Sequence, residues 1–148
     1  LHPGAVMVIG LLDDGRVVLE RQFRHPMQAV MIEFPAGKLD EGEDSLVCAR
    51  RELFEETGLT LEPSAWLGIS QLKAANGHRY VRLNVVFEPT ALPAQYQPQD
   101  SDILALHWYS ANELSQAALP LRSRLVSDAI SLYTQGVRLP LSLIQPTR

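Results

Sequence analysis

Three glutamates lie close together in a segment whose apolar residues repeat at helical spacing. On a helix, Glu52, Glu55 and Glu56 project within an arc of roughly 100°, so three carboxylates share one patch. Like charges at i,i+3 and i,i+4 each destabilise a helix by roughly 0.2–0.5 kcal/mol. A helix with a purely structural role would avoid this pattern, so we expect positive charge beside it.

Arg51 supplies part of that charge, because it can pair with Glu55 at i,i+4. One guanidinium cannot neutralise three carboxylates, and oxygen-only ligands favour Mg²⁺ or Mn²⁺ over zinc. The carbonyl of Gly37 is a further candidate ligand, since glycine allows the loop backbone to approach the helix closely. Divalent ions held there would bridge a diphosphate and lower the pKa of a bound water. The expected chemistry is hydrolysis at phosphorus.

A helix over residues 43–57 must position these groups. Its apolar face is predicted from spacings of three and four, at Leu46, Ala49 and Leu53, and widened by Val47 and Phe54. Acids at Glu43 and Asp44 suit its positive N-terminal end, and Gly58 is the expected C-cap.

Strands and shorter helices account for the rest of the chain. Ala5–Leu12 and Val17–Leu19 predict a hairpin around Asp13-Asp14-Gly15, Met31–Phe34 a short strand, and Pro35-Ala36-Gly37 a break in regular structure. Further strands are expected at 66–72, 81–87 and 103–109, with a turn at Asn76-Gly77, a surface loop at 89–99, and helices at 111–116 (capped by Ser110) and 121–135. This order predicts one domain over residues 1–148, an α/β/α sandwich with a central mixed β-sheet.

Composition narrows the classes of function. The 148 residues are 46% hydrophobic with a net charge of −4 and no basic stripe, which argues against nucleic-acid binding. No run of about 18 apolar residues or charged leader is present, so we expect a cytoplasmic protein without a membrane partner. A single cysteine, Cys48, excludes an internal disulfide framework and a thiolate metal cage. The sequence predicts no oligomeric state.

The segment 37–59 resembles the Nudix box at every defined position: a glycine, five residues, a glutamate, seven residues, then Arg-Glu-apolar-x-Glu-Glu-x-Gly-apolar. The resemblance implies the Nudix fold and an Mg²⁺-dependent pyrophosphohydrolase. It implies that Glu52, Glu55 and Glu56 are metal ligands together with the Gly37 carbonyl. Arg51 would hold Glu55 and Glu56 in place. Glu43 would support the site either by contacting the residues that bind the metal or by binding a further metal itself. Among these residues, Glu52 is our first choice for the general base.

The two halves of the chain resemble different Nudix branches. Residues 2–59, especially 19–26 and 32–40, look like ADP-ribose pyrophosphatases, although the N-terminal strand subdomain used by that branch for dimerisation is not expected here. The loop that would carry that branch's catalytic glutamate, 73–80, contains no acid. Residues 60–145 are similar to the phosphatase NudJ branch, which acts on nucleoside tri- and diphosphates and thiamine-type pyrophosphates. We hypothesise a recombined chain, a chimera joined near the end of the helix; the alternative is an intermediate family member.

Residues outside the box are candidates for further contacts. In many Nudix enzymes an acid six residues before the tryptophan of the last strand approaches the metals, and Asp102 stands six before Trp108. Asp102 is therefore a candidate ligand, with a loop-capping role as the alternative. Arg24 and Arg21 are candidate phosphate contacts, because a guanidinium binds phosphate oxygens bidentately.

Other side chains are candidates for the substrate entrance. Glu33 and Phe34 would line it, with a core position as the alternative for Phe34. The segment 78–80 is a place for a nucleobase or leaving group, or else a plain surface turn. Trp66 and Trp108 are expected in the core.

Two functions remain for this pattern. The favoured one is hydrolysis of a phosphoanhydride in nucleoside diphosphate-linked compounds, such as ADP-ribose, or in nucleoside di- and triphosphates. The resemblance of the second half of the chain to the NudJ branch slightly favours nucleoside di- and triphosphates over ADP-ribose as substrates. The alternative is a regulatory module that binds a nucleotide without turnover, which the intact glutamate set disfavours, because a binder has no physical need to keep the repulsion.

Overall fold

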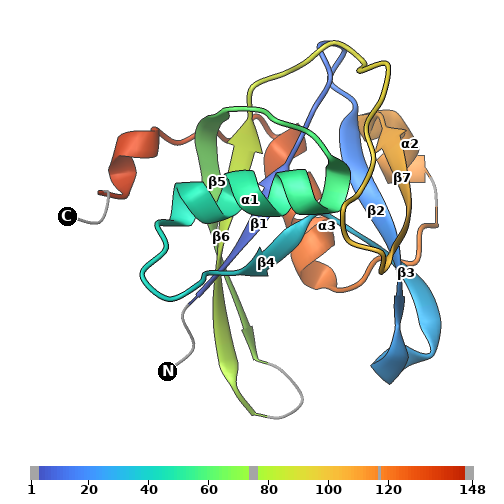
Figure 1. Ribbon diagram of the computed structural model, residues 1–148, viewed down its shortest axis with the longest axis horizontal. Coiled ribbons are helices and arrows are strands. Elements are labelled where there is room, and N and C mark those ends of the chain that lie inside the picture. The colour runs from blue at the N-terminus through green and yellow to red at the C-terminus, as the bar shows by residue number, and fades with distance from the viewer. Residues whose placement is uncertain (1–3, 74–76, 117, 146–148) are drawn as a thin grey trace.

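The computed structural model describes residues 4–73, 77–116 and 118–145, and within them seven strands and three α-helices (Figure 1). In chain order these are β1 (Ala5–Ile9), β2 (Val17–Arg24), β3 (Ala29–Glu33), β4 (Ala36–Lys38), α1 (Ser45–Thr57), β5 (Pro63–Lys73), β6 (Arg79–Phe87), β7 (Ile103–Tyr109), α2 (Ala111–Gln116) and α3 (Arg124–Thr134). Short 3-10 turns lie at His25–Met27 and Leu141–Leu143. None of the helices in the described part of the chain has the length and apolar character needed to cross a membrane.

The strands form two sheets between helices. The four-stranded sheet has the order β4-β1-β6-β5, with β1 parallel to β6 and the other pairs antiparallel, and the three-stranded sheet has the order β3-β2-β7. Figure 1 shows α1 in front of the four-stranded sheet and α3 behind it. The predicted α/β sandwich with a mixed sheet is confirmed, although the strands divide into two sheets.

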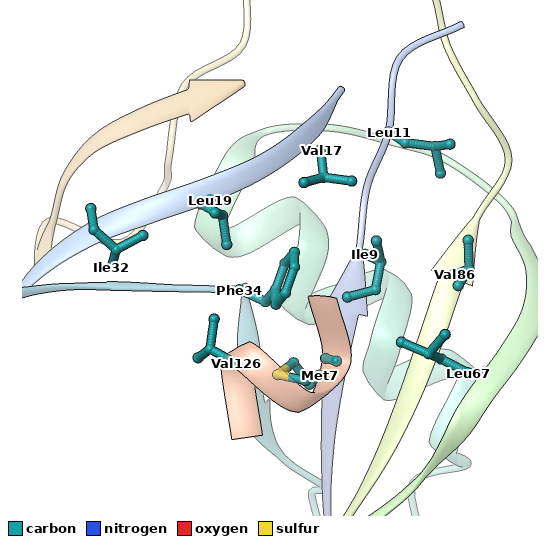
Figure 2. Packing of buried hydrophobic residues seen from close by; sticks show 11 residues of the cluster. Met7, Ile9, Leu11, Val17, Leu19, Ile32, Phe34, Leu67, Val86 and Val126 are labelled. Carbon is teal, nitrogen blue, oxygen red and sulfur yellow. The ribbon is translucent and has the colours of Figure 1, made fainter. Parts of the chain in front are cut away.

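β1 lies at the centre of the packing. Val6 and Val8 pack with the buried residues of α1, whereas Met7 and Ile9 pack with those of α3, and all four are fully buried. A strand covered on both faces reads as a continuous apolar run, which explains the composition of this segment. In Figure 2, Phe34 lies at the centre of the cluster on the α3 side, among side chains from both sheets. Phe34 is therefore a core residue.

The predicted hairpin around Asp13-Asp14-Gly15 is confirmed only at its tip. The N–H of Gly15 donates to the carbonyl of Leu12 at 2.9 Å, and Leu11 pairs antiparallel with Val17. Beyond this tip the strands separate, because β1 has β4 and β6 on its two edges, and β2 joins the other sheet. The predicted break is confirmed at Pro35, which lies between β3 and β4, and is wrong at Ala36 and Gly37, which belong to β4.

The helix that carries the acidic patch ends at Thr57 as predicted and begins at Ser45, two residues later than predicted. The Asp44 side chain accepts a hydrogen bond from the N–H of Leu46, and Gly58 ends α1 with a φ of 77°. A side chain at Gly58 would overlap the backbone of Gln97, so glycine also lets the following loop dock there. Val47 and Phe54 are exposed, so the apolar face is narrower than predicted.

Most other boundaries agree with the prediction. β5 and β6 are longer than predicted and pair antiparallel, while Asn76 of the predicted turn lies outside the described residues. β7 and α2 match their predicted bounds, and the Ser110 hydroxyl accepts from the N–H of Glu113. α3 begins at Arg124, three residues later than predicted, because Ser123 caps it.

Candidate active site

Arg51 is the centre of a network of carboxylates on α1. Its Nε and Nη2 donate to the two oxygens of Glu43, each at 2.9 Å, and this pair lowers the pKa of Glu43. Arg51 Nη1 donates to Glu52 at 2.9 Å and to Glu55 at 3.2 Å. Glu43 therefore fixes the guanidinium, which in turn orients two of the predicted metal ligands. These are the contacts that the predicted supporting roles require.

Glu56 is held differently from the prediction. Arg51 was expected to hold it, yet the backbone N–H of Ala36 donates to its carboxyl at 2.8 Å. The reason is geometric: Glu56 lies about 100° further round the helix than Glu55 and turns inward, where it is 8% exposed. The Glu56 carboxyl therefore belongs to the buried side of the patch.

The buried neighbour of Glu56 is Glu20, on β2. Glu20 is fully buried, and no group in the described ranges donates an N–H to its carboxyl oxygens. Burial raises the pKa of Glu20, and the charge of Glu56 raises it further. Burial raises the pKa of Glu56 as well, so both carboxyl groups favour the neutral form in the metal-free protein. Sequence reasoning missed Glu20, although an acid that follows the apolar run Val17–Leu19 was a usable signal.

Replacing Glu20 with glutamine is expected to stabilise the metal-free protein at alkaline pH. Because the folded-state pKa of Glu20 is raised, the stability that its neutral form contributes is present below the usual value of 4.5 and lost as pH rises through the folded pKa. Glu20→Gln stays neutral, so its melting temperature in EDTA should exceed that of the wild type by about 5 °C at pH 8.5 and by much less at pH 5. Glu88→Gln, at an exposed position, should give no such difference. A lower melting temperature for Glu20→Gln at pH 8.5 would show instead that Glu20 is held as an anion.

Gly37 lies directly against the ligand set. A Cβ at this position would overlap the carboxyl group of Glu52, so the two residues are in close contact. The donors gathered here are all oxygens: the Gly37 carbonyl, the three glutamates of α1 and, beneath Glu56, the unpartnered oxygens of Glu20. Hard divalent cations such as Mg²⁺ and Mn²⁺ prefer such donors, and the residues therefore fit them.

Two of these carboxylates also form ion pairs within the protein. Within residues 4–73, 77–116 and 118–145, no three His, Cys, Asp or Glu side chains converge closely enough to hold an ion as they stand. Arg51 engages one carboxylate oxygen of Glu52 and one of Glu55, which leaves the second oxygen of each side chain for a cation. Burial raises the pKa of Glu52 in spite of the opposing charge of Arg51, which suits a group that accepts a proton near neutral pH.

A cleft next to the glutamates is lined by basic side chains. It comprises two adjoining cavities of about 430 and 220 Å³, and Ala36 and Gly37 line the larger one. We name it the arginine cleft after the residues that line both cavities: Arg24, Glu33, Leu72, Arg82, Arg122 and Leu125. Arg24 donates to both oxygens of the buried Glu33, so Glu33 lies in the cleft as predicted and orients Arg24.

Sequence reasoning missed two of the three arginines in the cleft. Arg82 lies in a strand of ordinary alternating pattern, and Arg122 stands just before α3. Neither arginine has a local sequence signal. Strand pairing between β1 and β6 places Arg82, and a hydrogen bond from the N–H of Arg122 to the carbonyl of Ile32 places Arg122.

Two predicted site residues are not brought into the cleft. Arg21 is exposed, one residue along β2 from Glu20 and so on the other face of the strand. Asp102 is exposed as well, and its N–H donates to the Asp100 side chain. Its loop does reach α1, since the N–H groups of Gln99 and Asp100 donate to the Glu55 carbonyl at 2.7 and 3.0 Å. A ligand role for Asp102 stays a prediction.

Of the remaining candidates, Tyr80 lines the larger cavity, whereas Arg79 beside it is exposed. Trp66 is in the core as predicted, and its Nε1 donates to the Leu141 carbonyl at 3.0 Å. Trp108 is half-buried and makes an edge contact with Tyr96.

The sequence and the fold are similar to those of known proteins. The model of the NUDIX domain family matches residues 1–129. The chain is similar to the ADP-ribose pyrophosphatase of Bacillus subtilis, with 49% identity over 40% of this chain and 32% of that enzyme, and to phosphatase NudJ of Escherichia coli, with 38% identity over 74% and 71%. A solved NUDIX hydrolase from Nitrosomonas europaea superposes with a TM-score of 0.83 at 28% identity, covering 98% of this chain and 97% of that one.

These similarities bear on the hypothesis of a recombined chain. The similarity to phosphatase NudJ runs over 110 residues, which cannot fit between residues 60 and 145 and therefore extends into the first half. This extent favours an intermediate family member over a chain joined near the end of the helix.

Proposed function

The chain belongs to the NUDIX domain family, and on that premise we propose that it hydrolyses a phosphoanhydride bond in a small nucleotide, with Mg²⁺ or Mn²⁺ as its cofactor. The observation that carries the proposal is the all-oxygen donor set of α1, which adjoins the arginine cleft through Gly37, a residue that lines the cleft and lies against Glu52. A polyphosphate in this cleft would contact carboxylate-bound cations and guanidinium groups together, which is what hydrolysis of an anhydride requires.

The residues take distinct parts in this proposal. Glu52, Glu55 and Glu56 would hold the metal with the Gly37 carbonyl, and the bound cation supplies charge neutralisation and a more acidic water. Arg51 and Glu43 position these carboxylates. In the reaction one water oxygen bonds to a phosphorus, the bridging oxygen leaves with the other phosphate, and a proton passes to a carboxylate, for which Glu52 is the first choice.

The substrate belongs to one of two classes. The Bacillus subtilis relative is a pyrophosphatase of ADP-ribose, and the Escherichia coli relative is a phosphatase. Because the similarity spans only 32% of the first protein's length and 71% of the second's, either class is open to this chain.

A substrate panel tests the proposal. Release of phosphate and nucleoside monophosphate from ADP-ribose, ADP, ATP and thiamine diphosphate would be followed with Mg²⁺, with Mn²⁺ and with EDTA. We expect turnover with either metal at least about a hundredfold above the rate in EDTA. Nucleotide binding without turnover on any member would support the alternative, a regulatory module, and would overturn the hydrolase proposal.

A further inference from the structure

Arg82 is a half-buried cation without a matching anion. Its Nη1 donates only to the sulfur of Met7 at 3.9 Å, and a thioether is a weak acceptor. In the part of the chain that the structure describes, no carboxylate lies within ion-pair distance of this guanidinium, although other arginines there form nine ion pairs with acids. Burial lowers the pKa of Arg82, with the charge of Glu33 opposing that shift. Since arginine does not lose its proton in proteins, the buried charge needs an external partner.

The arginine cleft as a whole carries more positive than negative charge. Arg24 and Arg122 both face the single carboxylate of Glu33, Arg24 in a bidentate pair and Arg122 with its Nε 4.0 Å away. Strand pairing sets Arg82 beside Ala5 of β1, which also lines the larger cavity. Three guanidinium groups therefore share one carboxylate.

The start of α3 adds to this field. Ser123, the cap of the 11-residue helix, lines the smaller cavity together with Arg122. The N-terminal end of a helix carries a partial positive charge and favours anions. Leu72 and Leu125 add apolar lining to both cavities, where a sugar or base can pack.

We propose that Arg82 and Arg122, together with Arg24, bind the terminal phosphate of the substrate, so that the enzyme prefers compounds that end in a di- or triphosphate to compounds such as ADP-ribose. This inference rests on the proposed function. A diphosphate between two sugars, as in ADP-ribose, carries about two negative charges, both on the anhydride, whereas ADP and ATP carry about three or four because of the terminal group. The excess charge of a terminal phosphate matches the guanidinium groups that Glu33 leaves uncompensated, and its three oxygens suit their paired donors.

Binding of inorganic pyrophosphate to the metal-free protein tests the subsite without turnover. Titration calorimetry in EDTA should show affinity falling about tenfold or more in Arg82→Gln and in Arg122→Gln. Arg124→Gln is the matched control, because Arg124 is 81% exposed and pairs with Asp128. Should Arg82→Gln fail to fold, the more exposed Arg122 carries the test. Equal affinity in wild type, Arg122→Gln and Arg124→Gln would overturn the subsite.

Kinetics with Mg²⁺ test the substrate class. In Arg82→Gln and Arg122→Gln, KM for ADP should rise about tenfold or more, while KM for ADP-ribose should change less than about twofold. Equal losses for the two substrates would overturn the terminal-phosphate assignment and leave the hydrolase proposal standing. Conversely, absence of turnover in the wild type, with pyrophosphate binding that still depends on Arg82 and Arg122, would overturn the hydrolase proposal and support the subsite.

Discussion

Glu56→Gln should lower kcat by about a thousandfold while the protein still folds. Glu56 is the predicted ligand that Arg51 does not hold, and its carboxyl lies between the Ala36 N–H and Glu20. An amide has no charge to give to a divalent cation, so the loss in metal-dependent turnover should be large. The measurement is kcat at saturating Mg²⁺, with Mn²⁺ as a second metal.

The same substitution should slightly stabilise the metal-free protein. The amide oxygen can still accept from Ala36, and the new NH₂ group can donate to the unpartnered carboxyl of Glu20. Relief of the buried pair should raise the melting temperature in EDTA by about 3 °C.

Glu62→Gln is a suitable control, because Glu62 is exposed and pairs with Arg50 away from the cleft. Its kcat should equal that of the wild type. An unchanged kcat in Glu56→Gln would remove Glu56 from the site, and a large loss of stability would indicate a structural role instead.

Local sequence pattern was sufficient for the helix and its acidic patch. The spacing of Ala49 and Leu53 and the glycine at position 58 are short-range signals, and α1 follows them. Asp44, predicted as an acid in the first turn, is instead the N-cap. The resemblance to a known box then attached roles to the carboxylates. Both sources indicated the contact of Arg51 with Glu55, which the structure contains. Neither indicated the bidentate pair of Arg51 with Glu43, because that pair depends on how the loop before α1 folds back.

Pairing between distant strands determined what the sequence did not predict. Glu20 becomes a neighbour of Glu33 through β2–β3 pairing, and Arg82 a neighbour of Ala5 through the parallel β1–β6 pair. The hairpin around Asp13-Asp14-Gly15 is short for the same reason. A turn signal predicts the reversal of the chain but not which strands pair beyond it. The arginine cleft therefore emerges only from the topology.

Gly37→Ala should impair metal binding and turnover without destabilising the fold. The added methyl group would overlap the Glu52 carboxyl, which is the free end of a flexible side chain and can rotate away. The backbone of Gly37 does not lie in the left-handed region, so alanine causes no conformational strain there. We therefore expect kcat to fall about a hundredfold and Mn²⁺ affinity to weaken, with a melting temperature within about 3 °C of the wild type.

Gly136→Ala should behave in the opposite way, and the contrast makes the test of Gly37 specific. Gly136 has a φ of 81° with open space around its missing side chain, so alanine there costs about 1 kcal/mol of backbone strain far from the cleft. Its melting temperature should fall while kcat and Mn²⁺ affinity stay at wild-type values. If Gly37→Ala instead keeps both kcat and Mn²⁺ affinity, the position that Glu52 occupies against Gly37 is not the one from which it acts, and the ligand set must be drawn from the remaining glutamates.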